Sequence, residues 1–407
     1  MRLLIIVNVF DPDRGGGAAV FSDMCYALAE RGHEVTVRCA YPYYPEWSDK
    51  SGQNGLRVHR YRKNDAQIER YGLYIPSNPN SLVQRLVYEG SFFLSLLRGL
   101  PRGRGYDAVM VYCPLIGSVA YAAVHRFVFR QPVWLNVQDL SADAAAAAGI
   151  AKAGFVNRML AGIQNWLFNR ATVWSSISPV MIDRLRVLSK KNQPILFRPN
   201  WLNQSLGDEI AKLPSKVGRQ PGDPVRLLYA GNIGAKQDLL QFIQTLAASD
   251  ATFSFRIHGN GGGADDIRSW VEQSNDPRFT FGPFLDEAGF ARALHETDYF
   301  VITERSGSGG SFIPSKMIPG MASGSAILAV SDSTSPLGRE MREAEPGPWF
   351  GWDQLDTVAD TLSRPALEFE RWQQNAIDRA GDYARERIID GFEESLAELA
   401  RTGTATE

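Results

Sequence analysis

The sequence is poor in the residues that build metal centres and disulfide frameworks. Three cysteines, Cys25, Cys39 and Cys113, are scattered among 407 residues, together with five histidines. None of them falls at the spacing of a metal-ligand motif, and isolated cysteines of this kind are typical of reduced thiols in cytosolic proteins. No Ser/His/Asp nucleophile signature is present either. We therefore expect no metal site and a cytoplasmic location.

The sequence also lacks a net excess of positive or negative charge, and it lacks long apolar runs. The 43 Lys and Arg residues nearly balance the 45 Asp and Glu residues, which argues against nucleic acid as the main partner. No apolar run is long enough to span a bilayer. The apolar start at 3–7 is too short for a signal peptide and predicts a buried strand. The chain is long enough for two ordinary domains.

Apolar strands alternate with amphipathic helices, and the alternation occurs twice. The strands expected are 2–9, 34–39, 56–61, 108–112, 133–137, 173–177 and 195–198, then 225–229, 253–258, 278–281, 299–303 and 326–330. This order predicts an α/β protein with two doubly wound, Rossmann-like domains, whose ligands bind at the carboxyl ends of parallel strands in a shared cleft.

The domain boundaries follow from composition. Residues 1–206 form the expected first domain, and the Pro- and Gly-rich stretch 207–224 is interpreted as a linker. The second domain covers 225–367. The charged remainder, 368–407, is predicted to be helical and could pack back across both domains.

Glycine turns follow the first strand of each half. Gly15, Gly16 and Gly17 stand where the bare N–H groups of the backbone could meet a phosphate or a substrate hydroxyl, and a tight turn with positive φ is the alternative. The stretch 231–234 has the same placement in the second half, with Lys236 just beyond it.

The strongest functional signal is the glycine-rich loop at 306–311, which leads into Pro314, Ser315 and Lys316. Ordering so many glycines costs backbone entropy, so such a loop is better explained by close approach to a ligand than by stability. Proline, serine and lysine at a helix start would direct N–H groups and a cation at one point, which suits a diphosphate. Carboxylates are scarce here, since Glu304 is the only one at this loop.

Seven segments, taken in order, resemble one protein family. They are GGG at 15–17, LAERGHEV at 28–35, VQDL at 137–140, SISP at 176–179, PNW at 199–201, LYAGNIG at 228–234 and IPSK at 313–316. Together they resemble the GT-B glycosyltransferases of the large retaining family four. The similarity is greatest to the bacterial surface-polysaccharide branch that includes N-acetyl-L-fucosamine transferases, and it covers nearly the whole chain.

The resemblance implies a metal-independent, retaining hexosyltransferase. It would move a sugar from a UDP- or GDP-linked donor, held by the second domain, to a glycan or polyprenyl-diphosphate-linked acceptor held by the first. No cofactor is implied. Cationic side chains and the glycine loop would stabilise the departing nucleoside diphosphate electrostatically.

The resemblance also implies roles for individual residues. The donor-binding set is Gly16, Gly17, Asn232, Lys236, Glu304, Gly309, Gly310, Ser311, Ser315 and Lys316. Arg305, Lys316 and Asp139 are the implied catalytic residues, while Gly15, Gln138 and Asp139 would contact the acceptor or the transferred sugar. For Asp139, the alternative is a strand-end residue that caps the next helix.

The chain departs from the family at two acidic positions. Relatives commonly carry two glutamates spaced E-x7-E, and here the second position is Pro319 and the first falls near Gly309 or Ser311. Pro319 would also distort a helix begun at Pro314. A catalytically degenerate protein that binds a sugar nucleotide or a partner without transfer therefore stays open as the alternative. A GT-B sugar-nucleotide epimerase is less favoured.

Two segments, 82–104 and 152–170, mix apolar residues with arginines. Basic amphipathic helices of this kind can lie on an anionic membrane surface, here the inner face of the cytoplasmic membrane. The alternative is that their apolar faces pack on the first sheet.

Overall fold

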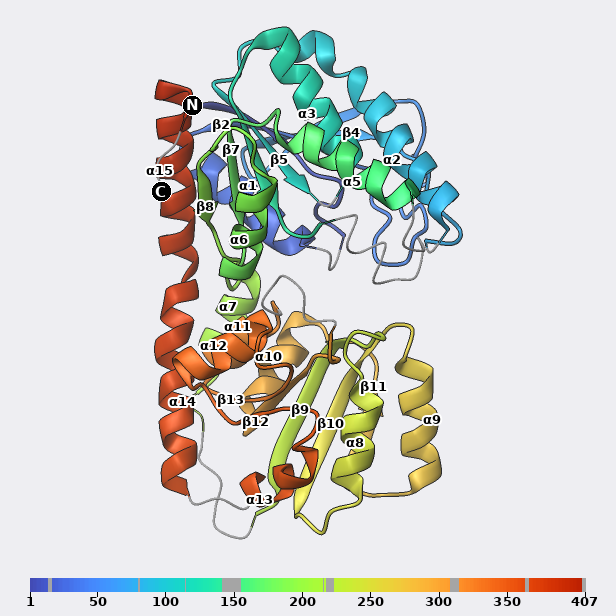
Figure 1. Cartoon of the computed structure of the whole chain (residues 1–407), viewed down its shortest axis with the longest axis vertical. Coiled ribbons are helices and arrows are strands. Elements are labelled where there is room, and N and C mark those ends of the chain that lie inside the picture. The colour runs from blue at the N-terminus through green and yellow to red at the C-terminus, as the bar shows by residue number, and fades with distance from the viewer. Residues whose placement is uncertain are drawn as a thin grey trace. The chain divides into compact units, whose positions relative to one another are not determined.

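The computed structural model describes residues 1–13, 17–79, 81–113, 115–140, 155–214, 216, 223–307, 315–362 and 366–404. Contacts between Cα atoms divide the chain into two compact units (Figure 1). Unit 1 consists of Met1–Pro199 and Glu386–Glu407, and unit 2 consists of Asn200–Arg385. Each unit is an α/β domain with its own sheet.

The sheet of unit 1 has eight strands in the order β3-β4-β2-β1-β5-β6-β7-β8. Their bounds are β1 Arg2–Ile6, β2 Glu34–Ala40, β3 His59–Lys63, β4 Ala66–Tyr71, β5 Ala108–Cys113, β6 Val133–Val137, β7 Val173–Ser176 and β8 Ile195–Phe197. All neighbouring strands are parallel except β3, which pairs antiparallel with β4. The strand order reverses between β1 and β5, which makes their carboxyl ends the switch point of this sheet.

The helices of unit 1 are α1 Ala18–Glu30, α2 Leu82–Leu97, α3 Ile116–Phe129, α5 Phe155–Phe168, α6 Pro179–Leu188 and α15 Arg385–Thr402. The last of these comes from the end of the chain and packs on the first sheet, where Phe392 stacks on the Trp134 ring. Arg31, at the end of α1, forms ion pairs with Glu386, Asp390 and Glu393 of α15.

The sheet of unit 2 has six parallel strands in the order β11-β10-β9-β12-β13-β14. The strands are β9 Val225–Asn232, β10 Phe253–Asn260, β11 Phe279–Gly282, β12 Tyr299–Thr303, β13 Ala326–Val330 and β14 Trp349–Phe350. Here the order reverses between β9 and β12. The switch point of this sheet therefore lies where Asn232 ends one strand and Thr303 ends the other.

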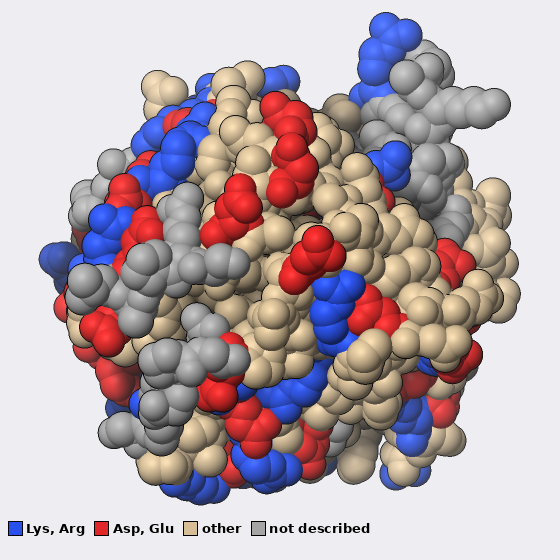
Figure 2. All heavy atoms as spheres, turned by 90° about the horizontal axis from the view of Figure 1, so that it is seen from below, with Lys and Arg blue, Asp and Glu red and all other residues tan. Residues whose placement is uncertain are grey.

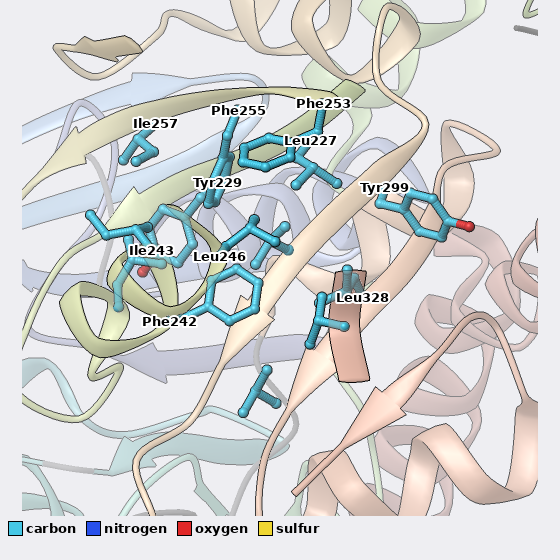
Figure 3. Packing of buried hydrophobic residues seen from close by; sticks show 14 of the residues in the cluster. Leu227, Tyr229, Phe242, Ile243, Leu246, Phe253, Phe255, Ile257, Tyr299 and Leu328 are labelled. Atoms are coloured by element: carbon cyan, nitrogen blue, oxygen red, sulfur yellow. The ribbon is translucent and has the colours of Figure 1, made fainter. Parts of the chain in front are cut away.

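The helices of unit 2 are α7 Gln204–Ala211, α8 Leu239–Ala247, α9 Ala264–Ser274, α10 Glu287–His295, α11 Met317–Ala322, α12 Pro336–Ala344, α13 Val358–Leu362 and α14 Ala366–Ala380. One face of the sheet packs with α8 in an apolar core, and Figure 3 shows Tyr229 and Phe242 within it. On the opposite face, Phe300 contacts Phe290 of α10 and lies against Gly320 of α11.

The boundary between the units differs from the predicted boundary after residue 206. Helix α7 begins at Gln204 and packs against α10, so the chain from Asn200 onward belongs to unit 2. Part of the predicted linker 207–224 is therefore the second half of this helix. The side chain of Asn203 caps α7 by accepting the Leu206 N–H at 3.0 Å, a start signal that the Pro- and Gly-rich composition further on obscured.

The surface carries charges of both signs. On the face drawn in Figure 2, basic and acidic side chains are interspersed among uncharged residues. This mixture matches the near balance of charges in the sequence. Among the described residues, no helix is both long enough and apolar enough to cross a membrane.

Candidate donor site and its counterpart in unit 1

The lysine of the Pro-Ser-Lys motif lies at the switch point of unit 2. The Nζ of Lys316 stands 3.9 Å from the centre of the Tyr229 ring. A Cβ placed on Gly231 would lie 3.8 Å from the same Nζ, so the ammonium also lies beside the end of β9. Gly231 has a φ of +138°, a backbone conformation that residues with a Cβ rarely adopt, so glycine is favoured here by its backbone rather than by lack of space.

The environment of this ammonium is unusual for a cation. The Nζ is buried and has no hydrogen-bond partner within the described part of the chain. Burial lowers the pKa of Lys316 from 10.5 to about 7. A buried cation is costly unless it is paired, so this arrangement favours the arrival of an anion.

Two further buried polar atoms near the end of β12 lack a partner among the described residues. They are the Thr303 Oγ1 and the Glu304 Oε2. Burial, followed by the charge of Asp332, raises the pKa of Glu304, while the Ser335 hydroxyl and Lys236 act in the opposite direction. Buried polar groups are nearly always satisfied in native proteins, so unpaired atoms at a strand end point to a polar ligand.

The turn after β9 is fixed by its own side chains. The Tyr229 hydroxyl donates to the Asn232 carbonyl at 2.6 Å, and the Gly234 N–H donates to the Gln237 Oε1 at 2.9 Å. The Arg305 N–H donates to the Lys236 carbonyl at 2.7 Å, which joins this turn to the segment after β12. The structure therefore brings Asn232, Lys236 and Arg305 to the same edge of the sheet as Lys316.

The predicted residues of unit 1 lie at the carboxyl ends of two different strands. Gln138 and Asp139 follow β6, where the Gln138 Nε2 donates to the Asn136 Oδ1 at 2.6 Å. The Asp139 Oδ1 accepts the N–H of the next residue, Leu140, at 2.8 Å. A helix cap would instead accept an N–H two or three residues further on, at positions outside the described residues. Gly17 precedes α1 with a φ of +85°, and a Cβ there would meet the Phe21 ring at 2.5 Å. A tight turn thus suffices to explain this glycine.

Several predicted positions lie outside the described residues, namely Gly15, Gly16, Gly309, Gly310 and Ser311. Ser315 is described and is exposed. In the part of the chain that is described, no group of three or more His, Cys, Asp or Glu residues is arranged to hold a metal ion.

The first comparisons with known proteins concern sequence. Residues 15–201 match the family described as the glycosyl transferase 4-like domain. The putative colanic acid biosynthesis glycosyl transferase WcaI of Escherichia coli K12 is 26% identical over 359 residues, which cover 85% of this chain and 87% of WcaI.

Solved structures match almost the whole chain. Sucrose-phosphate synthase from Thermosynechococcus elongatus has a TM-score of 0.74 at 16% identity, with 98% of both chains covered. HepE of Anabaena, solved with UDP and glucose, has a TM-score of 0.68 at 14% identity and covers 98% of this chain and 100% of its own. The lipopolysaccharide outer core galactosyltransferase WaaB has a TM-score of 0.63 at 12% identity, with 99% of both chains covered.

These solved structures show the GT-B fold. The matches at 15–201 and to WcaI support a glycosyltransferase. The two parallel sheets and their agreement with these structures confirm the predicted fold. The class of enzyme predicted from the seven motifs is confirmed as well.

One expectation about this glycosyltransferase was wrong in detail. Helix α11 begins at Met317 rather than Pro314 and has six residues, so Ser315 and Lys316 precede its first turn instead of lying within it. Pro319 lies in the first turn of this helix, where backbone N–H groups have no partner within the helix. The proline therefore causes no distortion, contrary to the prediction.

Sequence reasoning also missed residues of this edge. Tyr229, Thr303, Asp332 and Trp352 all contact or flank the predicted donor residues. Tyr229 belongs to the motif LYAGNIG, but the motif was interpreted through its glycines and not through the tyrosine. For Thr303, Asp332 and Trp352 the available signal was position, because polar residues at or just after the end of a buried parallel strand lie at the ligand edge of its sheet.

Proposed function

We propose that this glycosyltransferase moves a hexose from a nucleotide-sugar donor to a glycan or polyprenyl-diphosphate-linked acceptor in surface-polysaccharide synthesis. Unit 2 would bind the donor and unit 1 the acceptor. The observation that carries the proposal is the buried, unpartnered ammonium of Lys316 at the switch point of unit 2, as judged from the described residues. A diphosphate supplies the anion that this cation lacks.

The comparisons support the proposal from two directions. WcaI is named as a colanic acid biosynthesis enzyme and WaaB as a lipopolysaccharide galactosyltransferase, so both names concern surface glycans. HepE has been solved with UDP-glucose and with UDP and glucose. A UDP- or GDP-linked donor is therefore our first choice of substrate.

The chemistry we propose is electrostatic. When the bond between the anomeric carbon and the diphosphate breaks, negative charge grows on the leaving oxygen, and Lys316 and Arg305 stabilise it. Asn232, Lys236, Ser315 and the loop glycines would bind the same diphosphate, with Glu304 and Thr303 available to hydroxyl groups. Asp139 would contact the acceptor, and we propose that transfer proceeds with retention and without a metal ion.

Turnover separates this proposal from the degenerate alternative, which the absence of an acid at Pro319 keeps open. The assay incubates UDP- and GDP-sugars with a lipid-diphosphate acceptor and measures the nucleoside diphosphate released. We expect release that depends on the acceptor and falls strongly in the Lys316→Ala variant. Tight binding of a sugar nucleotide with no transfer to any acceptor would support the degenerate alternative instead.

We also propose that unit 1 contacts the membrane that carries such an acceptor. The four exposed side chains of α2 are Val83, Leu86, Val87 and Leu94, an apolar stripe on one side of the helix. The opposite side, with Phe92 and Leu96, is buried. One face of α2 is therefore packed inside unit 1, as the alternative to membrane contact requires. A second apolar face is left uncovered by the described residues.

The charges around this stripe suit an anionic surface. Arg98, Arg102 and Arg104 follow α2. The single acid of the segment 82–104, Glu89, turns inward and accepts the Gly117 N–H at 2.7 Å, and burial raises its pKa to about 8. In α5, Met159, Ile163 and Trp166 are exposed, and the Arg170 guanidinium lies 4.5 Å from the Trp166 ring. Basic residues beside exposed apolar ones are typical of interfacial helices.

A further inference from the structure

Asp332 joins the ends of two neighbouring strands at the candidate donor site. It follows β13 closely, and its Oδ1 accepts the Ser306 hydroxyl at 2.8 Å while its Oδ2 accepts the Gly307 N–H at 2.6 Å. Ser306 and Gly307 come directly after Arg305 and begin the glycine-rich loop. Both oxygens of one carboxylate thus hold the start of this loop.

The turn that carries Asp332 is itself fixed. Its carbonyl accepts the Ser335 N–H at 3.1 Å, and the Ser335 hydroxyl caps α12 by accepting the Gly338 N–H at 3.1 Å. A Cβ on Gly338 would lie 2.3 Å from the Asp332 carbonyl oxygen, so the helix approaches this turn as closely as a glycine permits. Asp332 is therefore a rigid anchor rather than a mobile surface acid.

The segment held by Asp332 is fastened at each of four successive residues. The Glu304 N–H donates to the Val330 carbonyl at 2.8 Å, and the Trp352 Nε1 donates to the Glu304 carbonyl at 2.8 Å. The Arg305 N–H donates to Lys236, and Asp332 holds the next two residues. The Arg305 side chain nevertheless remains 59% exposed, with its Nε 4.0 Å from the Asp238 Oδ2. Its backbone is fixed while its guanidinium stays accessible.

We propose that Asp332 is a positioning residue that holds the loop start at 306–307 and thereby places the Arg305 guanidinium for the donor diphosphate. The inference rests on the proposed function. Its physical basis is preorganisation, because a cation whose backbone is already fixed loses less conformational entropy when it engages the diphosphate. Asp332 acts through Arg305 and does not itself contact the donor.

A double-mutant cycle tests this dependence. The kcat/KM for the donor is measured for wild type, Asp332→Ala, Arg305→Ala and the double variant. We expect Asp332→Ala alone to lower kcat/KM by between about tenfold and a hundredfold, the range for a misplaced catalytic group. In a protein that already carries Arg305→Ala, adding Asp332→Ala should lower kcat/KM by less than about twofold, because the side chain that Asp332 positions is already absent.

Conservative variants separate positioning from simple loss of stability. Asp332→Asn should recover most of the activity, since an amide oxygen still accepts the Gly307 N–H and the Ser306 hydroxyl can rotate to accept from the amide nitrogen. The matched control is Asp250→Ala, an exposed aspartate that precedes β10 at the opposite end of the sheet. It should leave kcat/KM unchanged. If Asp332→Ala does not fold, Ser306→Ala, which removes only the hydroxyl contact, takes its place in the cycle.

The outcomes distinguish this inference from the proposed function. Unchanged kcat/KM in Asp332→Ala, or effects of Asp332→Ala and Arg305→Ala that multiply, would overturn the positioning role. The proposed function would survive either outcome if Arg305→Ala and Lys316→Ala each weakened the binding of the nucleoside diphosphate. Nucleoside diphosphate binding that neither Arg305→Ala nor Lys316→Ala alters would instead overturn the proposed function itself.

Discussion

The Lys316 ammonium lies 3.9 Å from the centre of the Tyr229 ring and is the cation around which the candidate donor site is built. The ring gives it a partly favourable partner, since aromatic faces attract cations. The Tyr229 hydroxyl meanwhile bonds the Asn232 carbonyl and so ties the ring to the turn after β9. One tyrosine thus supports both the lysine and the turn that would meet the same diphosphate.

Replacing the lysine by an apolar residue of similar length should separate stability from binding. In the ligand-free protein, Lys316→Met removes a buried cation that lacks a partner among the described residues, and we expect the free energy of unfolding to rise by about 1–2 kcal/mol. The stabilisation that a nucleoside diphosphate gives the wild type should disappear. Thermal unfolding with and without UDP or GDP measures both effects. A destabilised variant that still responds to nucleotide would contradict this account of Lys316.

The affinity for the diphosphate should depend on pH through the same lysine. Burial lowers its pKa to about 7, so the ammonium is largely deprotonated in the free protein above that pH. Binding then requires uptake of a proton, and we expect the affinity to fall by up to about tenfold per pH unit between roughly pH 7.5 and 9. The Lys316→Ala variant should show a flatter profile. Parallel profiles for the two proteins would exclude Lys316 as the titrating group.

The stability of the ligand-free protein should change with pH in the opposite direction. The unfolded chain keeps its lysine protonated up to about 10.5, whereas the folded chain releases the proton near 7. The unfolded state thus binds more protons between these values, and the contribution of Lys316 to stability rises with pH across this window. Buried Lys216, whose pKa burial also lowers to about 7, contributes in the same sense. The difference between wild type and Lys316→Met isolates the part that belongs to Lys316.

Gly231 should tolerate a side chain poorly because of its backbone. Its φ of +138° is disfavoured for residues with a Cβ, and we expect Gly231→Ala to destabilise the protein by about 1–3 kcal/mol. Relaxation of the strain would also move the end of β9 against Lys316 and weaken nucleotide binding. The matched control is Gly262→Ala, in the turn after the neighbouring strand β10, because a Cβ there meets nothing within 4 Å. Equal losses in the two variants, measured by denaturant unfolding and nucleotide titration, would disprove the special role of Gly231.

The apolar stripe of α2 should govern contact with lipid. Val83 and Leu94 are 69% and 64% exposed, and we expect the double change Val83→Glu with Leu94→Glu to reduce co-flotation with anionic vesicles by at least about tenfold. The control is Leu56→Glu, which introduces the same charge at a residue that is 86% exposed and lies outside the stripe. Flotation of the wild type that does not depend on anionic lipid, or an equal loss in both variants, would argue against docking through α2.

Much of the fold could be predicted from sequence because each unit repeats one simple pattern. Buried parallel strands have nearly continuous apolar sequences, and glycine turns mark their carboxyl ends. The antiparallel pair of β3 and β4 was harder to predict from the sequence. The pattern predicted a strand at 56–61, but the structure has two strands joined at Asn64 and Asp65, both with positive φ. This Asn-Asp pair was the signal for a hairpin turn.

The candidate site was less accessible to sequence reasoning because it depends on contacts between strands that are distant in the chain. Motifs identified Lys316, Asn232 and Arg305 from their neighbours in sequence. Tyr229 and Asp332 gain their places only when β9, β12 and β13 are paired, which no local pattern specifies. The short length of α11 was equally hidden, since a Pro-Ser-Lys start is compatible with helices of any length.

Calorimetric titration of UDP and GDP into wild type and Lys316→Ala tests the central claim most directly. The account predicts that at least one of the two nucleotides binds the wild type, and that Lys316→Ala weakens its binding by about 1–3 kcal/mol, the range for losing a charged hydrogen-bond partner. Lys212→Ala, which removes an exposed lysine at the C-cap of α7, should leave the affinity unchanged. Equal affinity of wild type and Lys316→Ala for the nucleotide would contradict the account.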